Sequence, residues 1–356
     1  MNDRENALKN ATFSGPEWMP CSVHISGASW NQLRSELEKV LVRHPLLFPG
    51  FEPGKRCFDE MDFGPAHRAN ERFKDNWGCV WESSIDGIEG VVVENPLEDW
   101  DKLETYAPPD PAKLSDRGPV DWDEIEKGIR EAKARDELTS GGLPHGFFFM
   151  RLYYLRGFEG FMTDLAVKDP RLNRLIELLL RHNQHLVKRW IDMGVDVVGF
   201  ADDLGTQTSS LIGPSSFSEW IAPAYAQLMQ PCRKAGQHVH LHSDGYLMDL
   251  VDDLFKAGVT ILNPQDLCNG IDNLARHVKG RMCIHLDIDR QSIVPFGTRQ
   301  DIHDLIEEEV RKLGSSQGGL SMIAGIYPPT PPKNVDALCS AMEDFMTYWW
   351  DGRAPG

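Results

Sequence analysis

The sequence has no apolar run that approaches the roughly 18 residues that a membrane-spanning helix needs. Its first ten residues, MNDRENALKN, are polar and charged, unlike the hydrophobic segment of a secretory signal. These two absences predict a cytoplasmic protein that does not insert into a membrane.

Basic charge and closely paired cysteines are also scarce. The chain has 37 Lys and Arg residues against 54 Asp and Glu residues, which gives a formal net charge of −17. A nucleic-acid-binding surface needs a basic footprint, so nucleic acid is not expected as a partner. The seven cysteines are scattered and form no CxxC pair, which fits a reducing compartment better than a disulfide framework.

The order of predicted elements indicates an α/β fold. Short strands that alternate with helices imply parallel βαβ units, and we expect residues 1–356 to form a single (β/α)₈ TIM barrel domain. Residues 1–145 are irregular and hold the early barrel elements, whereas 146–350 contain clear βα repeats. The alternative is a doubly wound sheet, although no strand is followed by a GxGxxG phosphate loop.

The predicted elements follow from apolar periodicity and from helix start and stop signals. In the first part, helices are expected over 30–43 and 121–138, the second being strongly charged and solvent-exposed. Later strands are predicted at 195–203, 237–242, 259–263, 282–289 and 320–326. Later helices are predicted at 170–193, 216–234, 246–257, 271–278, 299–313 and 334–350. Ser216 and Glu219 are expected to form a capping box.

The predicted strands end in an unusual number of polar side chains. In the strand at 237–242, the two-residue alternation puts Val239 and Leu241 toward the helices. His240 and His242 then lie together on the opposite face, with Asp244 following at the barrel mouth. Histidines and carboxylates are costly to bury unless they are paired, metal-bound or catalytic.

An H-x-H pair on one strand can bind one metal ion, with a third ligand from elsewhere. Asp287 and Asp203, at the ends of two other strands, are the candidates for that ligand. The histidines could instead be hydrogen-bonded interior residues, and Asp202, Asp203 and Asp287 could instead cap helices or act as general acids and bases. His182 and His185 lie in a helix rich in Arg, Asn and Gln and are expected on a solvated face.

Several segments resemble the uroporphyrinogen decarboxylase superfamily. These are ADDLGTQTSSLIGPSSFSEWIAPAY (201–225), GQHVHLHSDG (236–245), GTRQDIHDLIEEEV (297–310) and YPPTPPKNVDAL (327–338). The superfamily includes zinc-dependent, corrinoid-linked methyltransferases and is related to cobalamin-independent methionine synthase. The resemblance covers about residues 144–350 and implies a (β/α)₈ barrel.

The resemblance carries the methyltransferases' zinc ligands over only in part. They bind zinc through a His-x-Cys pair and a later Cys, and the metal activates a thiol as methyl acceptor. Here the pair falls on His240 and His242, so the second ligand is His in place of Cys. The later Cys would fall near Ala324, which offers no ligand.

The decarboxylase residues are also carried over incompletely. Uroporphyrinogen decarboxylases place a His at about the position of Ala324 and hold substrate carboxylates with an arginine-bearing N-terminal segment. The only arginines among the first 40 residues of this sequence are Arg4 and Arg34. The resemblance places Asp75, in DNWGCVW (75–81), at the position of their catalytic Asp.

The leading interpretation is a metal-dependent methyltransferase or demethylase that acts on a small molecule. His240 and His242 are expected to bind Zn²⁺ together with Asp287 or Asp203, and Asp244 is a further candidate catalytic carboxylate. A corrinoid protein is the partner that the resemblance implies.

Two alternatives stay open. One is a metal-free decarboxylase or lyase, in which Asp202, Asp203 or Asp75 stabilises a cationic intermediate and Arg151 or Arg156 holds a substrate carboxylate. The other is a non-catalytic barrel that binds a tetrapyrrole or a corrinoid.

Overall fold

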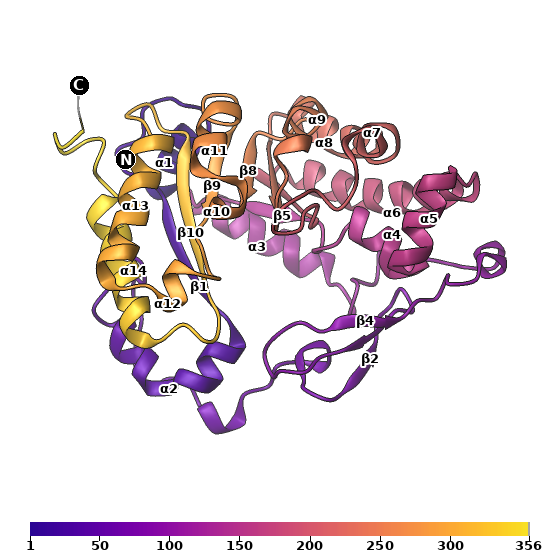
Figure 1. The fold of residues 1–356 in the computed structure, drawn as a ribbon, viewed down its shortest axis with the longest axis horizontal. Helices are drawn as coiled ribbons and strands as arrows, with labels where there is room; N and C mark the ends of the chain where they lie inside the picture. Colours follow the sequence, from indigo (N-terminus) through magenta and orange to yellow (C-terminus); the bar gives the residue numbers. More distant parts are fainter. Residues whose placement is uncertain (355–356) are drawn as a thin grey trace. The chain divides into compact units, whose positions relative to one another are not determined.

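A computed structural model describes residues 1–354 (Figure 1). The chain divides into two compact units. Unit 1 comprises Met1–Glu71, Ser83–Gly90 and Pro264–Gly356, and unit 2 comprises Arg72–Glu82 and Val91–Asn263. Within residues 1–354, every helix is too short or too polar to cross a lipid bilayer.

Unit 2 is built on strands that follow one another in space as they do in sequence, in the order β5-β6-β7-β8. β5 pairs with β6 and β6 with β7 in parallel. The strands are β5 (Ser140–Gly142), β6 (Val197–Ala201), β7 (His238–Ser243) and β8 (Ile261–Pro264), whose last residue begins unit 1. The helices are α3 (Trp122–Ala134), α4 (Phe149–Arg156), α5 (Phe158–Val167), α6 (Arg171–Met193), α7 (Pro214–Ser216), α8 (Ala222–Lys234) and α9 (Val251–Ala257).

A separate antiparallel sheet in unit 2 accounts for part of the irregular N-terminal region. Its order is β2-β3-β4, formed by Arg72–Lys74, Val80–Glu82 and Val91–Glu94. The short helical turns of the chain are Phe58–Glu60 and Pro65–His67 in unit 1 and Trp100–Glu104, Phe217–Ile221 and Met248–Leu250 in unit 2.

Unit 1 holds three parallel strands in the order β1-β10-β9. These are β1 (Cys21–Ile25), β9 (Cys283–Asp287) and β10 (Leu320–Ile326). The helices are α1 (Asp3–Ala11), α2 (Gly27–Leu41), α10 (Asp266–Asn269), α11 (Ile271–His277), α12 (Ile293–Phe296), α13 (Arg299–Leu313) and α14 (Pro332–Phe345).

The strand pairing confirms the predicted α/β fold of the (β/α)₈ type. In unit 1 the first parallel strand of the chain, β1, lies beside the last, β10, which is the neighbourhood that barrel closure creates. In unit 2 the spatial order follows the chain order without the reversal of a doubly wound sheet. The doubly wound alternative is therefore set aside. The single-domain organisation of residues 1–356 stays a prediction.

Two local predictions are wrong. The capping box of Ser216 and Glu219 does not form, because the helix begins one turn earlier at Pro214 and the Glu219 carboxylate pairs with Lys168. His182 is buried rather than exposed, and its ring packs 4.5 Å from that of Trp77. Burial lowers the pKa of His182 to about 4. His185 is exposed, as predicted.

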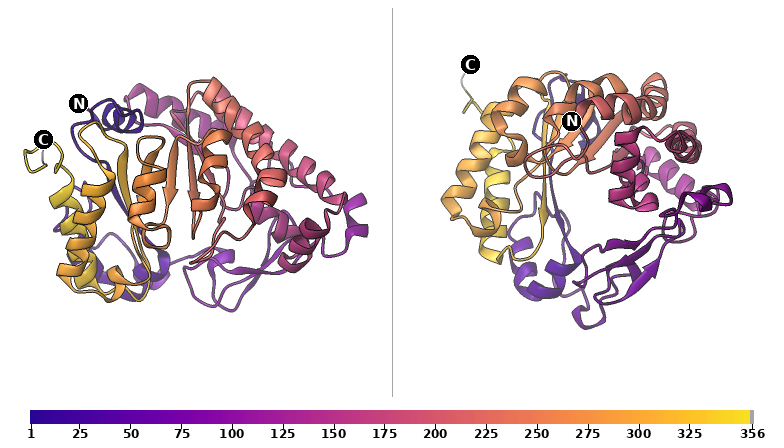
Figure 2. Two further views of the ribbon diagram at one scale, coloured as in Figure 1. Left: turned by 45° about the horizontal axis from the view of Figure 1, so that its top comes forward. Right: turned by 45° about the vertical axis from the view of Figure 1, so that its right-hand side comes forward.

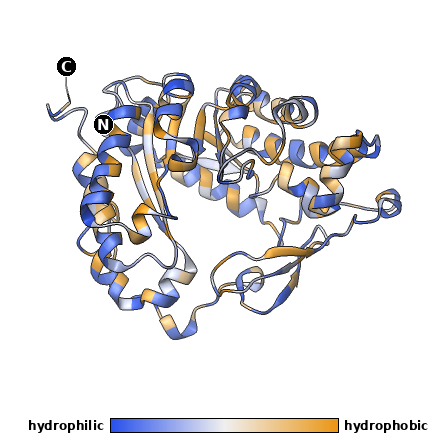
Figure 3. Cartoon of the chain, in the orientation of Figure 1, coloured by the Kyte–Doolittle hydropathy of each residue, from blue (hydrophilic) through white to orange (hydrophobic). Residues whose placement is uncertain are grey.

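Helices α13 and α14 pack against each other in unit 1 (Figure 2). Ile302, Ile306 and Val310 recur every four residues along α13, and all three are fully buried. Blue and orange residues alternate along both helices in Figure 3, as expected for amphipathic helices. The apolar face of α13 thus closes the core of unit 1.

One acidic residue, Glu309, interrupts that apolar face. Its side chain is fully buried, and no N–H or O–H donor within residues 1–354 reaches either carboxyl oxygen. The carboxyl group of Asp266 is the neighbouring acidic group that acts on it most strongly. Burial, together with Asp266, raises the pKa of Glu309 well above its ordinary 4.5. Burial raises the pKa of Asp266 as well, so both shifts favour the protonated form of the pair.

We predict that Glu309→Gln flattens the pH dependence of stability. The raised pKa of Glu309 means that the folded chain retains a proton that the unfolded chain has lost above its ordinary pKa. The contribution of Glu309 to the free energy of unfolding is therefore complete below its ordinary pKa of 4.5 and is lost as the pH rises above it. From about pH 5 to about pH 9, the free energy of unfolding of the variant should rise by at least about 1.4 kcal/mol relative to that of the wild type, as measured by urea denaturation. This is the free energy that corresponds to a pKa shift of one unit.

Glu308→Gln is the matched control, because Glu308 lies on the same helix and forms an exposed pair with Lys312. It should leave the pH profile unchanged. Parallel profiles for the wild type and Glu309→Gln would show that the pair carries no shared proton.

Candidate functional site

The histidine-rich strand β7 adopts the predicted alternation. Val239 and Leu241 are fully buried, whereas His238, His240 and His242 are each half-buried on the opposite face. The β-branched and aliphatic side chains take the dry face because a slip of one residue would bury imidazoles in their place. The predicted shared face of His240 and His242 is therefore confirmed.

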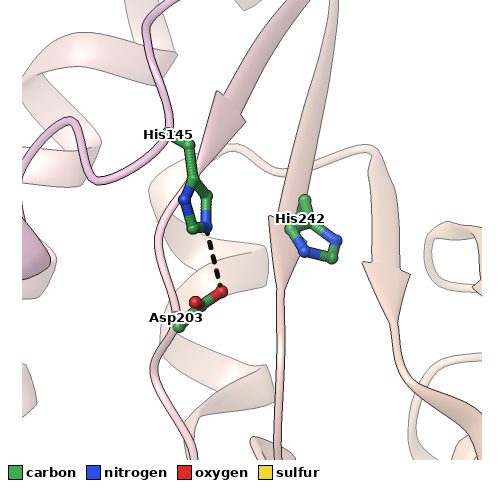
Figure 4. Close-up of side chains that lie close together, drawn as sticks. All are labelled: His145, Asp203 and His242. Carbon is green, nitrogen blue, oxygen red and sulfur yellow. Dashed lines mark hydrogen bonds and ion pairs between the residues drawn. The ribbon is translucent and has the colours of Figure 1, made fainter. Parts of the chain in front are cut away.

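His242 meets two side chains from other segments of unit 2 (Figure 4). The ligand atoms of His145, Asp203 and His242 all lie within 4.8 Å of one another. His145 Nε2 is 3.2 Å from Asp203 Oδ1, and the rings of His145 and His242 are 6.1 Å apart. His145 comes from the turn after β5, Asp203 follows β6, and His242 lies near the end of β7. The strand ends thus converge as expected in this fold.

Neighbouring side chains fix the His242 ring. Its Nδ1 lies 2.8 Å from Asn263 Oδ1, so this nitrogen carries the hydrogen that the amide oxygen accepts. In the neutral ring, Nε2 then keeps the lone pair that a metal or a proton can take. Asp244 Oδ1 lies 3.3 Å from Nε2. Asn263 and Asp244 therefore contact the two ring nitrogens of this imidazole.

Asp203 is held in place through its backbone and its side chain. The Asp244 N–H donates to Asp203 Oδ1 at 3.1 Å, and the Asp203 N–H points at the Met150 sulfur at 3.2 Å. The side chains of His145, Asp203 and His242 are 40%, 22% and 22% exposed. The group is thus ordered by the protein and still open to a ligand.

Asp202, the neighbouring carboxylate, has no access to water. Its oxygens accept the backbone N–H groups of Phe148, Phe149 and Met150 at 3.2, 2.5 and 2.8 Å, and the Tyr225 hydroxyl at 2.8 Å. Burial raises the pKa of Asp202 to about 6, although these donors oppose the shift. Asp202 therefore caps the start of α4, which is the capping role that the sequence left open.

The structure leaves His240, one of the sequence-predicted metal ligands, outside the candidate metal group of unit 2. Within residues 1–354, His240 belongs to none of the groups of three side chains that could hold an ion. Asp287 lies in unit 1, where it is 4% exposed and its Oδ2 is 3.1 Å from Arg290. A site that joins His240, His242 and Asp287 stays a prediction.

Another group of side chains that could hold a metal ion lies on α13 in unit 1. It consists of His303, Asp304 and Glu307. Its carboxylates already have polar partners, since Glu307 pairs with Arg311 at 2.6 Å and Asp304 accepts from Gln300 at 2.7 Å. This group is therefore a weaker candidate than the one at the strand ends.

Asp75 and Arg151, expected as catalytic residues, are paired with each other in the interior of unit 2. Their side chains are 1% and 2% exposed, and Arg151 also contacts Asp116. Asp75 accepts the Cys79 N–H and the Trp81 indole N–H. Both charges are thus engaged by the protein, because an unpaired buried charge would be very costly.

Arg156, the other arginine considered for substrate binding, is engaged as well. Its Nε donates to Asp164 Oδ2 at 2.7 Å, and its side chain is 14% exposed. Both arginines are thus paired with carboxylates of the protein, and their role in substrate binding stays a prediction.

Sequence reasoning missed His145. It stands alone in the segment LPHGFFF, outside the predicted strands, and no spacing ties it to another ligand. The available signal was its place next to a glycine after the short strand β5. Gly146 has a φ of +71°, where a Cβ would be strained.

We predict that Arg151 acts on stability. Arg151→Met leaves Asp75 and Asp116 without their cation, so the free energy of unfolding should fall by about 3–5 kcal/mol in urea denaturation. Arg181→Met is the control, because the exposed pair of Arg181 with Glu177 should contribute less than about 0.5 kcal/mol. A stable Arg151→Met variant would restore Arg151 as a candidate for substrate binding.

Comparisons with known proteins give the fold and the family of the chain. A methyltransferase from Methanosarcina mazei has a similar structure, with a TM-score of 0.63 and 17% identity over 96% of this chain and 98% of that one. At that identity the likeness shows the fold.

Two further solved structures are less similar. A B12-independent methionine synthase from Shewanella sp. W3-18-1 has a TM-score of 0.41 and 11% identity, over 64% of this chain and 67% of that one. A 3-keto-D-glucoside 4-epimerase from E. coli has a TM-score of 0.38 and 13% identity, over 64% of this chain and 88% of that one. No curated protein matches the sequence. The uroporphyrinogen decarboxylase (URO-D) model matches residues 81–345, well over half of the chain, and the chain therefore belongs to the URO-D family.

Proposed function

We propose that the chain is a metal-dependent methyltransferase whose Zn²⁺ ligands are His145, Asp203 and His242. The observation that carries this proposal is the convergence of these three ligand atoms within 4.8 Å at the strand ends. Two imidazoles and one carboxylate are a donor set that suits catalytic zinc, which keeps a further position open. The residues present therefore fit the metal that the family resemblance implies.

A bound Zn²⁺ would supply a Lewis acid that lowers the pKa of a thiol or hydroxyl methyl acceptor. The chain's own residues prepare the site for it. Asn263 accepts the Nδ1 hydrogen of His242 and so leaves Nε2 as the ligand atom. The Asp244 N–H orients Asp203, and Asp244 places a second carboxylate beside His242 that can take a proton from an incoming acceptor.

A small methyl acceptor and a corrinoid protein as methyl carrier complete the proposal. The fold shared with a methyltransferase supports it. The metal-free decarboxylase is less well supported, because Arg151 and Arg156 are engaged by Asp75, Asp116 and Asp164. A non-catalytic carrier would leave the ordered group of His145, Asp203 and His242 without a role.

Metal binding is the first expected outcome. Protein prepared without a histidine tag should bind about one Zn²⁺ per chain, measured by elemental analysis. Added Zn²⁺ at about 100 times its Kd should raise the free energy of unfolding by about 2.7 kcal/mol. His145→Ala and His242→Ala should each weaken Zn²⁺ binding and so reduce that gain.

His240→Ala separates the two ligand sets. It should keep Zn²⁺ if His145, Asp203 and His242 are the ligands, and should lose it if His240 and His242 form the site. His185→Ala is the control for removing an exposed histidine. Wild-type protein that binds no metal and gains no stability from Zn²⁺ would refute the proposed site.

Methyl transfer is the second expected outcome. Methylcobalamin can stand in for a methylated corrinoid protein, and a small thiol for the acceptor. The thiolate takes the methyl group, giving a thioether and cob(I)alamin, which visible absorbance detects under anaerobic conditions. The Zn²⁺-loaded chain should accelerate this reaction at least about tenfold over the thiol alone, and His242→Ala should not. No acceleration with any of a panel of thiols would argue against methyl transfer to thiols.

A further inference from the structure

The turn that carries His145 is held by hydrogen bonds to the end of β6 and to a side chain of α6. The Gly146 N–H donates to the Ala201 carbonyl at 2.8 Å, and the Asn183 amide donates to the Phe147 carbonyl at 2.8 Å. The next three N–H groups, those of residues 148–150, all point at the carboxylate of Asp202. These five backbone groups of the turn thus each have a partner.

Asp202 and Asp203 face in different directions at the same strand end. Asp203 lies in the half-exposed group with His145 and His242, whereas Asp202 is fully buried beneath the turn. Asp202, the residue next to the candidate ligand Asp203, therefore binds the backbone three to five residues after another candidate ligand, His145. His145 Nε2 lies 3.2 Å from Asp203 Oδ1 at this strand end.

Other side chains do not replace this function of Asp202. Phe148 is the residue that caps α4, and its side chain makes no capping hydrogen bond. Tyr225 contributes its hydroxyl to the carboxylate of Asp202 and contacts the rings of Phe147 and Phe148. Without the carboxylate, three buried N–H groups and one hydroxyl would lose their acceptor, and the turn would move to find others.

We propose that Asp202 is a positioning residue of the candidate metal site, which sets the place of His145 by accepting the N–H groups of the turn that follows it. The inference rests on the proposed function for the identity of the metal. Its geometric content, that Asp202 holds His145 beside Asp203, is independent of any metal. Partners of this kind typically change metal affinity by about 10- to 100-fold.

The test compares Zn²⁺ affinity in a double-mutant cycle. Asp202→Asn keeps the size of the side chain but turns one acceptor oxygen into a donor, which faces N–H groups. It should weaken Zn²⁺ binding by about 10- to 100-fold, measured by competition with a chelating dye. In a His145→Ala background, Asp202→Asn should have little further effect, because the ligand that it positions is already absent.

Two further variants guard against loss of folding as the explanation. Tyr225→Phe removes a single bond to Asp202 and should give a smaller change in the same direction. Thr139→Val removes the Thr139 hydroxyl bond to Asp196 at the other end of the strands, so it should lower the Tm without changing Zn²⁺ affinity. Equal losses of affinity in Thr139→Val and Asp202→Asn would overturn the inference.

A metal-free measurement separates this inference from the proposed function. In protein without metal, Asp202→Asn should shift the imidazole NMR signals of His145 and speed hydrogen exchange at residues 148–150, and Thr139→Val should do neither. If the wild type binds no Zn²⁺ but these changes appear, the proposed function fails and the positioning role stands. If the wild type binds Zn²⁺ and Asp202→Asn leaves affinity, signals and exchange unchanged, the positioning role is refuted.

Discussion

A carboxylate that is cut off from water needs a donor for its oxygens, and this requirement shapes the loops of both units. Asp202 meets it with three backbone N–H groups and a tyrosine hydroxyl. Asp289 meets it with the N–H groups of residues 291–294 at the start of α12. Glu309 has no such donor, and burial beside Asp266 favours its protonated form. Each solution ties a loop or helix end to a definite position.

The same constraint explains which parts of the molecule could be predicted from the sequence. Apolar periodicity located β10 and α13 to the residue, because burial of one face determines both. It also gave the common face of His240 and His242. The Ser216 capping box failed because Pro214 offered an earlier start to the helix.

The candidate site could be predicted only in part. His242 and Asp203 follow from their places at strand ends. His145 lies in a turn whose path depends on bonds to Asp202 and Asn183, and such contacts between distant residues leave no local pattern. The burial of Asp75, Arg151 and His182 likewise depends on the packing of segments far apart in sequence. A strand's period is a local property, whereas the partner of a buried charge is a property of the whole unit.

The pairing of Arg151 also places two indole rings in a defined electric field. The indole N–H of Trp77 donates to Asp116 at 2.8 Å and that of Trp81 to Asp75 at 2.9 Å. The Arg151 guanidinium lies 4.9 Å from the centre of the Trp77 ring. Both rings are 3% exposed, and their excited states are sensitive to nearby charge and hydrogen bonding. Trp77 and Trp81 are thus intrinsic fluorophores whose emission depends on whether Arg151 remains paired with Asp75 and Asp116. An attached label is not needed to follow that pairing.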